Sequence, residues 1–451
     1  MTWLRLLPAS LRSRLEGRQT LHDIIANTGW MFFDKVMRMG VGFLIVVWVT
    51  RHLGPEQFGR LSYAIAFVSL FAAVANLGLY GIVVRDIVRY PDAREQIIGT
   101  ALGLKCIGGC LCLLLAVGLI LAVRPGDTTV QWLVAIIAAG TIFQSLDVFD
   151  FWFQSQLQSK FVSLANIPGF LVMAGVKITL ILVNAPLVAF AWATCFDFVL
   201  AGIGLASAYQ LTTRRLAKLR FSGKWAKSLL RDSWPAIFAG LMLMVYSRID
   251  QVMIGQMMDD TSVGLYAAAA KLAEFWYFFP TLILNSILPS IVKAKQQGEE
   301  VYGRRIQQVL NLMAIISYLF VLPVALFSPL IMGFLYGPAY LAAAPVLAVY
   351  VISGVFVFLG HAREHWVVVE NITRFSMYST ALGALTNIAL NLVLIPLWGS
   401  LGAAYATLCS VAVAGYLVNA FHGKTRPIFV LQTRAVLLVD VARALVAKKG
   451  A

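Results

Sequence analysis

The sequence predicts an all-α membrane protein with twelve transmembrane helices in two six-helix lobes around a central cavity. Twelve apolar stretches lie between Trp30 and Phe421, each about long enough to cross a bilayer. Hydrophobic residues make up 60% of the 451 residues and charged residues only 13%, and a soluble domain of that composition would lack a polar exterior. Because hydrocarbon offers the backbone no hydrogen-bond partner, the spans are expected to be helices.

The expected spans follow one another with short connections. They are residues 30–50, 61–84, 97–123, 130–152, 161–183, 187–209, 236–256, 263–288, 309–335, 342–360, 376–397 and 401–421. The residues before the first span are polar and basic and carry no signal-peptide cleavage site, which predicts a retained tail. All five cysteines fall inside spans, where they act as small apolar side chains, so neither disulfides nor a metal cluster is expected.

Basic residues mark one side of the membrane. On the side of the N-terminus they recur in the tail, in every second connection and after Phe421, whereas the opposite side carries only Arg51, Arg60 and Arg124. The positive-inside rule then places both termini in the cytoplasm. Most of the net charge of +15 therefore faces anionic headgroups, and no zinc-finger spacing or interleaving of aromatic and basic residues supports nucleic-acid binding.

The most basic connection, residues 210–232, leaves six spans on either side and predicts a linker between two lobes. The expected parts are a cytoplasmic tail at 1–29, an N-lobe at 30–209, a cytoplasmic linker at 210–232, a C-lobe at 233–421 and a second cytoplasmic tail at 422–451. The lobes begin alike, because Trp30 precedes Phe58-Gly59 by almost the distance at which Trp234 precedes Val263-Gly264. Weak internal similarity of this kind is typical of duplicated transporter folds, in which the substrate cavity lies between the lobes. A single match can also arise by chance.

The sequence predicts neither an enzyme nor a cofactor. External connections are too short to form a catalytic domain. The string from Gly54 to Arg60 lacks the lysine and the serine or threonine of a phosphate-binding loop. His361-Ala-Arg-Glu364-His365 matches H-x-x-E-H, but no third ligand is evident, so a polar helix end at the cytoplasmic surface is favoured over a zinc site.

Charged residues inside the spans are the candidate functional residues, because an ionised side chain at membrane depth persists only beside a partner or a polar cavity. Each also has a structural interpretation, as a helix-end residue, a lysine that reaches the headgroups or a carboxyl group hydrogen-bonded within its own lobe. Seven spans carry them: Asp34, Lys35 and Arg38; Lys105; Asp147 and Asp150; Lys177; Asp197; Arg248 and Asp250; Lys271 and Glu274.

Asparagine and proline residues interrupt or bound several spans. They include Asn76, Asn285, Asn387 and Asn391, and Pro168, Pro280, Pro289 and Pro323. Bends at proline either serve motions between lobes or, more often, are packing features. Residues 429–451 also have two interpretations, a helix on the inner membrane surface or a frayed end.

Four strings resemble signatures of the bacterial polysaccharide exporters related to the Wzx-type O-antigen flippases. They are LGPEQFGRLSYAIAFVSLFAAVANLGL from Leu53, followed by Arg85, SWPAIFAGLMLMVYSRIDQVMIG from Ser233, VGLYAAAAKLAEFW from Val263 and TNIALNLVLIPLWGSLGAAYAT from Thr386. The resemblance extends from Asn27 to about Tyr416 and is specific in combination. It points to the polysaccharide transport family of the multidrug/oligosaccharidyl-lipid/polysaccharide exporter superfamily.

The resemblance implies a V-shaped transporter of the bacterial inner membrane that takes part in lipopolysaccharide or other polysaccharide biosynthesis. Its substrate would be an undecaprenyl-diphosphate-linked oligosaccharide, such as an O-antigen repeat unit, flipped to the outer leaflet by alternating access. An ion gradient, of protons or sodium, would drive an antiporter of this kind. Membrane lipids and the polymerase and chain-length proteins of the same pathway are the other expected partners.

Within that framework we assign roles to the charged residues of the spans. Lys35, Arg38, Arg248 and Lys271 are expected to neutralise the diphosphate or an acidic sugar, because cations suit an anionic substrate. Asp34, Asp147, Asp150, Asp250 and Glu274 are expected to pair with them or to bind the coupling cation. A multidrug or peptidoglycan-precursor exporter of the same superfamily is the main alternative, followed by a membrane glycosyltransferase or polymerase and by a structural scaffold.

Overall fold

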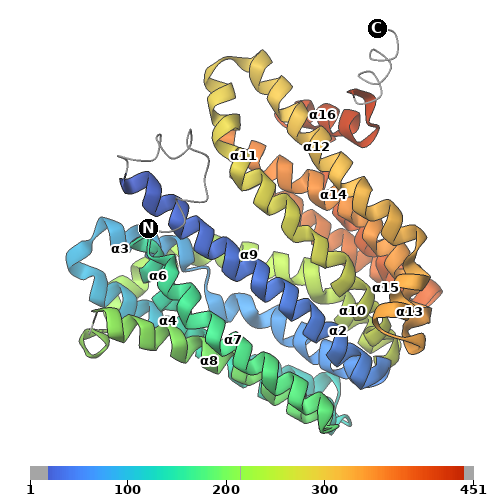
Figure 1. The fold of residues 1–451 in the computed structure, drawn as a ribbon, viewed down its shortest axis with the longest axis horizontal. Helices are drawn as coiled ribbons and strands as arrows, with labels where there is room; N and C mark the ends of the chain where they lie inside the picture. Colours follow the sequence, from blue (N-terminus) through green and yellow to red (C-terminus); the bar gives the residue numbers. More distant parts are fainter. Residues whose placement is uncertain (1–18, 214, 441–451) are drawn as a thin grey trace, which may run out of the picture. The chain divides into compact units, whose positions relative to one another are not determined.

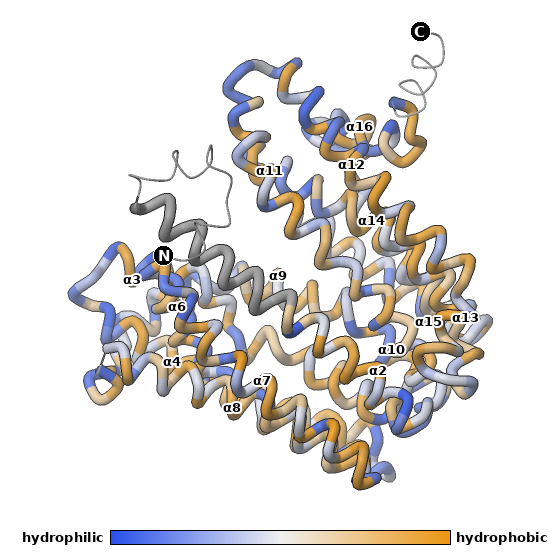
Figure 2. The backbone as a smooth tube through the Cα atoms, in the orientation of Figure 1, coloured by the Kyte–Doolittle hydropathy of each residue, from blue (hydrophilic) through white to orange (hydrophobic). Residues whose placement is uncertain are grey.

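The computed structural model describes the backbone of residues 19–213 and 215–440, and the side chains of residues 37–158, 160–213 and 215–440. Within these ranges the chain forms helices joined by short turns and contains no strand (Figure 1). Figure 2 shows apolar residues along most helices and polar residues gathered at many of the connections. The prediction of an all-α membrane fold is therefore confirmed.

Among the described residues, ten helical stretches are long and apolar enough to cross a membrane. Two of them are far longer than one crossing, Met37–Arg89 with 53 residues and Thr373–Ala420 with 48. Each contains a non-helical glycine with positive φ, Gly54 at 68° and Gly399 at 61°. Glycine alone adopts this region without strain, and the chain reverses there between two crossings. Dividing both stretches at these glycines is consistent with the twelve expected spans.

The structure divides into two compact units, the first comprising Met1–Val46 and Phe71–Phe238. Its core joins α3, α4, α6 and α8 through buried aromatic and aliphatic side chains, among them Phe149, Phe153 and Tyr209. Inside this unit α4 packs on α5, and α8 packs on both α5 and α7. The helices are α3 (Tyr80–Arg89), α4 (Arg94–Val123), α5 (Thr128–Phe143), α6 (Val148–Ser155), α7 (Ser159–Leu182) and α8 (Leu187–Thr213).

The second unit comprises Val47–Leu70 and Ala239–Ala451. Its centre is α14, which packs on α10, α12 and α15, while α16 packs on α12 (Figure 1). Its helices are α10 (Asp260–Glu274), α11 (Phe278–Gln296), α12 (Glu299–Leu326), α13 (Ser328–Leu335), α14 (Ala344–Val369), α15 (Thr373–Gly415) and α16 (Arg426–Val436). α2 (Gln19–Asn76) and α9 (Gly223–Met257) contribute residues to both units.

Two of the expected spans are each divided into two helices by a short 3₁₀ segment. η3 (Gln144–Asp147) separates α5 from α6, and η5 (Phe275–Tyr277) separates α10 from α11. Such segments inside a helix often mark strain or a functional hinge. Two of the candidate acidic residues lie at these breaks, Asp147 in the first and Glu274 immediately before the second. The other 3₁₀ segments of the described chain are η2 (Pro91–Ala93), η4 (Leu216–Lys218), η6 (Pro338–Ala343) and η7 (Leu417–Ala420).

The basic connection at 210–232 is more ordered than a flexible linker. Its second half is already helical, because α9 begins at Gly223. Its first half is fastened to α4, where Arg215 Nη1 lies 2.9 Å from Glu95 Oε1 and the Ser222 amide donates to Thr100 Oγ1 at 2.9 Å. Since the α9 helix runs from this connection into the seventh span, the lobe limits expected at 209 and 233 stay a prediction.

The segment Val47–Leu70 of α2 packs on α10 by backbone contact inside the second unit. A Cβ atom on Gly59 would lie 1.7 Å from the carbonyl oxygen of Asp260, and one on Gly264 would lie 1.9 Å from that of Pro55. Each glycine therefore faces the residue four positions before the other, which is a reciprocal, two-fold-like contact. These are the glycines that the sequence comparison of the two halves aligned.

Candidate functional site

A buried carboxylate in the second unit, Asp250 of α9, is held entirely by neutral donors. Only 3% of Asp250 is exposed. Tyr266 OH and Thr407 Oγ1 donate to its Oδ2 at 2.6 and 2.7 Å, and Asn391 Nδ2 donates to its Oδ1. Among the described residues no lysine or arginine forms an ion pair with it. A full negative charge in this setting is costly unless a proton or a cation joins it.

The same cluster contains an amide oxygen without a hydrogen-bond partner. Asn391 Nδ2 also donates to Asn387 Oδ1 at 3.0 Å, which leaves Asn391 Oδ1 as an acceptor, buried and without a donor among the described residues. Carboxylate, hydroxyl and amide oxygens are the ligands that hard cations take in proteins. The side-chain oxygens of Asp250, Asn387, Asn391 and Thr407, drawn from α9 and both halves of α15, are of this kind.

Arg248 lies two residues before Asp250 and belongs to a second, more exposed cluster. Two residues along an α-helix turn the side-chain direction by about 200°, so the two charges leave α9 on nearly opposite faces. Arg248 Nη1 lies 3.5 Å from Glu274 Oε2, with 33% and 27% of these side chains exposed. Tyr350 OH donates to Glu274 Oε1 at 3.1 Å. The pair is thus accessible enough to exchange one partner for a ligand.

Two tyrosines join these clusters. Tyr266, which donates to Asp250, contacts Tyr350, which donates to Glu274, with ring centroids 5.8 Å apart at 74°. Tyr266 OH lies 2.9 Å from Thr407 Oγ1 as well. A change in the occupation of the Asp250 cluster therefore has a direct packing route to the Arg248–Glu274 pair.

The first unit holds its own charged residues in pairs. Lys105 of α4 is 2% exposed and bonds to Asp147 and, at 3.4 Å, to Asn76 Oδ1. Asp150 accepts from Gln154 Nε2, whose Oε1 accepts from Tyr80 OH. Lys177 of α7 pairs with Asp197 of α8. Asp147 is the last residue of η3, and Asp150 follows it in α6.

We expect the Lys105–Asp147 pair to matter for folding more than the Lys177–Asp197 pair. Asp147→Asn leaves the ammonium of Lys105 buried without its counter-charge, so the free energy of unfolding is expected to fall by about 3 kcal/mol. Asp197→Asn is the matched control, since Lys177 is 25% exposed and reaches solvent more easily. Thermal unfolding of both purified variants measures the difference, and equal losses would contradict the prediction.

The structure places the remaining predicted residues as follows. Arg38 is half-buried in α2, in its first-unit part, and Lys271 is half-buried in α10. Asp34 and Lys35 lie in α2, but their side chains fall outside the described ranges. Of the expected substrate-binding residues, Arg248 pairs with one of the expected acidic residues, Glu274.

Sequence reasoning gave no role to the neutral partners of Asp250. Asn387 and Asn391 appeared only as helix interruptions, although their i, i+4 spacing places both amides on one face of an apolar helix. Tyr266 and Thr407 appeared only within family strings. Two amides on one face of a span were the signal that could have found the cluster.

The H-x-x-E-H string forms part of a polar cluster around Arg363, inside a helix that continues to Val369. Arg363 is 3% exposed and donates to the carbonyl oxygen of Ala414 at 2.9 Å and to Ser379 Oγ. Glu364 bonds to Arg363 and to Ser376. Within the described ranges no group of three or more His, Cys, Asp or Glu residues could hold a metal ion. The string thus belongs to the packing of α14 on α15.

Comparison with known proteins agrees with this architecture. The sequence model described as "Polysaccharide biosynthesis protein" matches residues 24–295, and the MatE model matches residues 235–393. The protein named "Probable low-salt glycan biosynthesis flippase Agl15" from Haloferax volcanii is 25% identical over 402 residues, which cover 87% of this chain and 82% of that protein.

Two solved structures have the same fold at low sequence identity. An inward-facing multidrug resistance MATE family transporter of the MOP superfamily matches with a TM-score of 0.70 and 16% identity, over 88% of this chain and 95% of the other. The lipid II flippase MurJ in an inward closed conformation matches with a TM-score of 0.69 and 13% identity, over 93% of each chain. With a matching family model over more than half of its length, this multi-pass membrane protein with a MOP-type fold belongs to the polysaccharide biosynthesis protein family.

Proposed function

We propose that this protein flips an undecaprenyl-diphosphate-linked oligosaccharide, such as an O-antigen or exopolysaccharide repeat unit, from the inner to the outer leaflet of the bacterial inner membrane. Family membership and the flippases among its relatives and fold neighbours support the proposal. The substrate's polar head cannot cross hydrocarbon unaided, whereas its polyprenyl tail can stay in lipid. A transporter that alternately opens to either leaflet supplies the head with a polar path.

Lys35, Arg38, Arg248 and Lys271 are the proposed contacts of the diphosphate or of an acidic sugar. Arg248 carries the clearest support, because its guanidinium is partly exposed and its ion pair with Glu274 is long at 3.5 Å. A diphosphate oxygen that replaced the Glu274 carboxylate would gain a charge-assisted hydrogen bond. Glu274 would keep its bond from Tyr350 meanwhile.

The single observation that carries the driving mechanism is the Asp250 cluster, with its buried charge and its orphan amide oxygen. Protonation of Asp250 would neutralise the charge but would leave Asn391 Oδ1 without a partner. A sodium ion bound by the cluster would satisfy both, so sodium is the favoured coupling ion. Asp34, Asp147 and Asp150 stay secondary candidates for coupling or charge pairing.

Contact of Tyr266 with Tyr350 would couple the ion to the substrate. When a cation occupies the Asp250 cluster, it competes with Tyr266 for Oδ2, and a shift of the Tyr266 ring presses on Tyr350. Movement of Tyr350 would then change the strength of the ion pair between Glu274 and Arg248. An antiporter needs such a connection between its two sites. The ion and the substrate must each bind with different affinity in the two conformational states of the transporter.

Deletion of the gene in its host, and its expression in a strain that lacks a flippase, test the proposed identity of the substrate. The expected result is that loss of the protein leaves a lipid-linked glycan on the inner leaflet, and that the protein restores surface polysaccharide in a strain without its own flippase. Restored drug efflux or peptidoglycan-precursor export without a change in surface polysaccharide would favour the other exporters of the superfamily. Sugar transfer by the purified protein would favour an enzyme.

Charge changes at Arg248 and Glu274 test the binding assignment. Arg248→Gln is expected to lower transport by about tenfold to a hundredfold, because a charge-assisted contact with the diphosphate is worth about 1.5–3 kcal/mol. Glu274→Gln leaves Arg248 free for the substrate and is expected to preserve its binding. Surface polysaccharide and retained lipid-linked glycan are measured at equal protein abundance, with Arg304→Gln as the control for loss of an exposed charge. Wild-type transport by Arg248→Gln would remove Arg248 from the site.

A further inference from the structure

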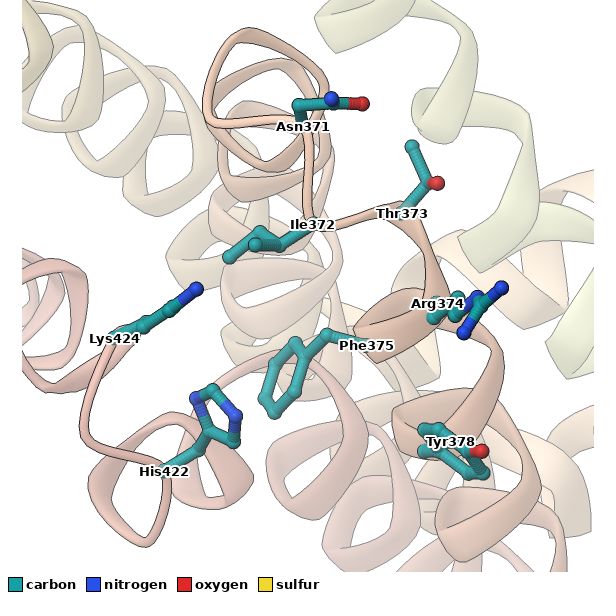
Figure 3. Close-up of a pocket in the computed structure, with 8 residues that line it drawn as sticks. All are labelled: Asn371, Ile372, Thr373, Arg374, Phe375, Tyr378, His422 and Lys424. Atoms are coloured by element: carbon teal, nitrogen blue, oxygen red, sulfur yellow. The ribbon is translucent and has the colours of Figure 1, made fainter.

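A cavity at one end of the second unit is lined by cationic and aromatic side chains. Its volume is about 520 Å³. The lining residues come from the α14–α15 turn, from the first turns of α15 and from the turn after η7 (Figure 3): Asn371, Ile372, Thr373, Arg374, Phe375, Tyr378, His422 and Lys424. Two of these residues carry full positive charges, and none of the eight carries a carboxylate. The cavity therefore suits an anion.

The wall of the cavity is built before any ligand arrives. The Phe375 ring contacts the His422 ring at 5.2 Å, and the Arg363 guanidinium lies 5.7 Å from its centroid. Arg363 is itself fixed by Ser379 and the Ala414 carbonyl. Asn371 adopts a positive φ of 57° in the short turn that leads into α15. A rigid aromatic wall with cations around it costs a ligand little ordering entropy.

The basic groups of the cavity are available for a ligand. Arg374 and Lys424 are exposed, and within the described part of the chain neither forms an ion pair. Figure 3 shows Lys424 and His422 on one side of the Phe375 ring and Arg374 and Tyr378 on the other. Two such cations more than balance the single negative charge of one phosphodiester.

The position of the cavity points to a lipid. It lies where the membrane-spanning stretch Pro338–Val369 ends and the stretch Thr373–Ala420 begins and ends, which is the headgroup level. From Tyr378 an exposed apolar stripe continues along the same face of α15 at helical spacing, through Leu382, Leu385 and Leu392. A molecule with a phosphate in the cavity would lay its acyl chains along this stripe.

We propose that this cavity binds the phosphodiester headgroup of an anionic phospholipid from the surrounding leaflet. Arg374 and Lys424 contact the phosphate, Tyr378 anchors at the interface, and the stripe on α15 receives one acyl chain. The positive-inside orientation makes this leaflet the cytoplasmic one. Lipid binding here would hold the α14–α15 turn and the start of α16 together.

Binding of short-chain phosphatidylglycerol to the detergent-purified full chain tests the proposal, measured by native mass spectrometry. In the double variant Arg374→Gln, Lys424→Gln, affinity is expected to fall by about tenfold or more, since each basic residue near an anionic lipid is worth about 1 kcal/mol. Lys293→Gln with Arg304→Gln removes two exposed charges from the α11–α12 connection and is expected to leave affinity unchanged. Leu385→Gln tests the apolar stripe separately. It is expected to lower the affinity for phosphatidylglycerol but not the affinity for inorganic phosphate, which has no acyl chain.

Several outcomes would overturn the proposal. Equal affinity of the two double variants would show that net charge, and not the cavity, attracts the lipid. Equal binding of short-chain phosphatidylcholine would remove the role of the cations. If inorganic phosphate competed at the same concentration as phosphatidylglycerol, the cavity would be a phosphate site to which acyl chains contribute nothing. A polyprenyl diphosphate that displaced phosphatidylglycerol at far lower concentration would reassign the cavity to the transported lipid.

Discussion

Asp250→Asn is expected to abolish the proposed coupling of transport to an ion while leaving the protein folded. The substitution removes the one full negative charge of a buried cluster whose other members, Tyr266, Asn391 and Thr407, are neutral. An interaction with a buried full charge is worth about 3–5 kcal/mol, so cation affinity should fall by about two orders of magnitude or more. The shape of the side chain hardly changes, which limits the loss of packing.

Thermal unfolding at constant ionic strength measures binding of the cation directly. A ligand that binds only the folded state raises stability with its concentration, so sodium in place of choline is expected to raise the melting temperature of the wild type but not of Asp250→Asn. Asp259→Asn is the matched control, because Asp259 caps α10 by accepting from the Ser262 amide at 2.7 Å and asparagine caps a helix equally well. Sodium stabilisation that survives in Asp250→Asn would place the ion elsewhere.

Gly59→Ala is expected to be strongly destabilising, although alanine is the better helix former. Its Cβ would lie 1.7 Å from the Asp260 carbonyl oxygen, and backbone cannot move aside as a flexible side chain can. The two helices must separate, which costs about 3 kcal/mol or more when overpacking is severe. Gly264→Ala faces the same problem against Pro55, with 1.9 Å.

Gly303→Ala is the control for these glycine variants. Gly303 lies inside α12 with nothing within 4 Å of its missing Cβ, so alanine there should stabilise by about 0.5–1 kcal/mol through helix propensity. The melting temperatures of the three variants are compared in the same detergent. If all three glycines tolerated alanine alike, the backbone contact between α2 and α10 would not exist in solution.

Much of the fold follows from composition and hydropathy, because a backbone in lipid must satisfy its own hydrogen bonds. Apolar length predicted the spans, and their helical state follows from the lack of hydrogen-bond partners in hydrocarbon. Hydropathy could not predict the interruptions η3 and η5, since Gln144–Asp147 and Phe275–Tyr277 lie inside otherwise continuous apolar stretches. It could not predict the ordering of the basic connection either, which depends on contacts of Arg215 and Ser222 with α4.

The candidate site was less predictable, because sequence shows which charges enter the membrane but not what they face. The i, i+2 spacing of Arg248 and Asp250 indicates opposite faces, yet only the structure shows that one face is a closed polar cluster and the other an exposed ion pair. Arg363 illustrates the opposite failure. Its place in the H-x-x-E-H string predicted a residue of a polar helix end at the surface, whereas the packing of α14 on α15 buries it.

The membership of Val47–Leu70 in the second unit has a mechanical consequence. α2 leaves the first unit between Val46 and Val47 and returns between Leu70 and Phe71, and both passages fall within helix and not in a loop. A helix resists bending, so neither these passages in α2 nor the one in α9 between Phe238 and Ala239 offers a loop at which the chain can turn freely. Gly40 and Gly42 lie one to two turns before the first passage, and glycine stiffens a helix less than other residues do. Bending of these helices would store elastic strain, which opposes a change of conformation.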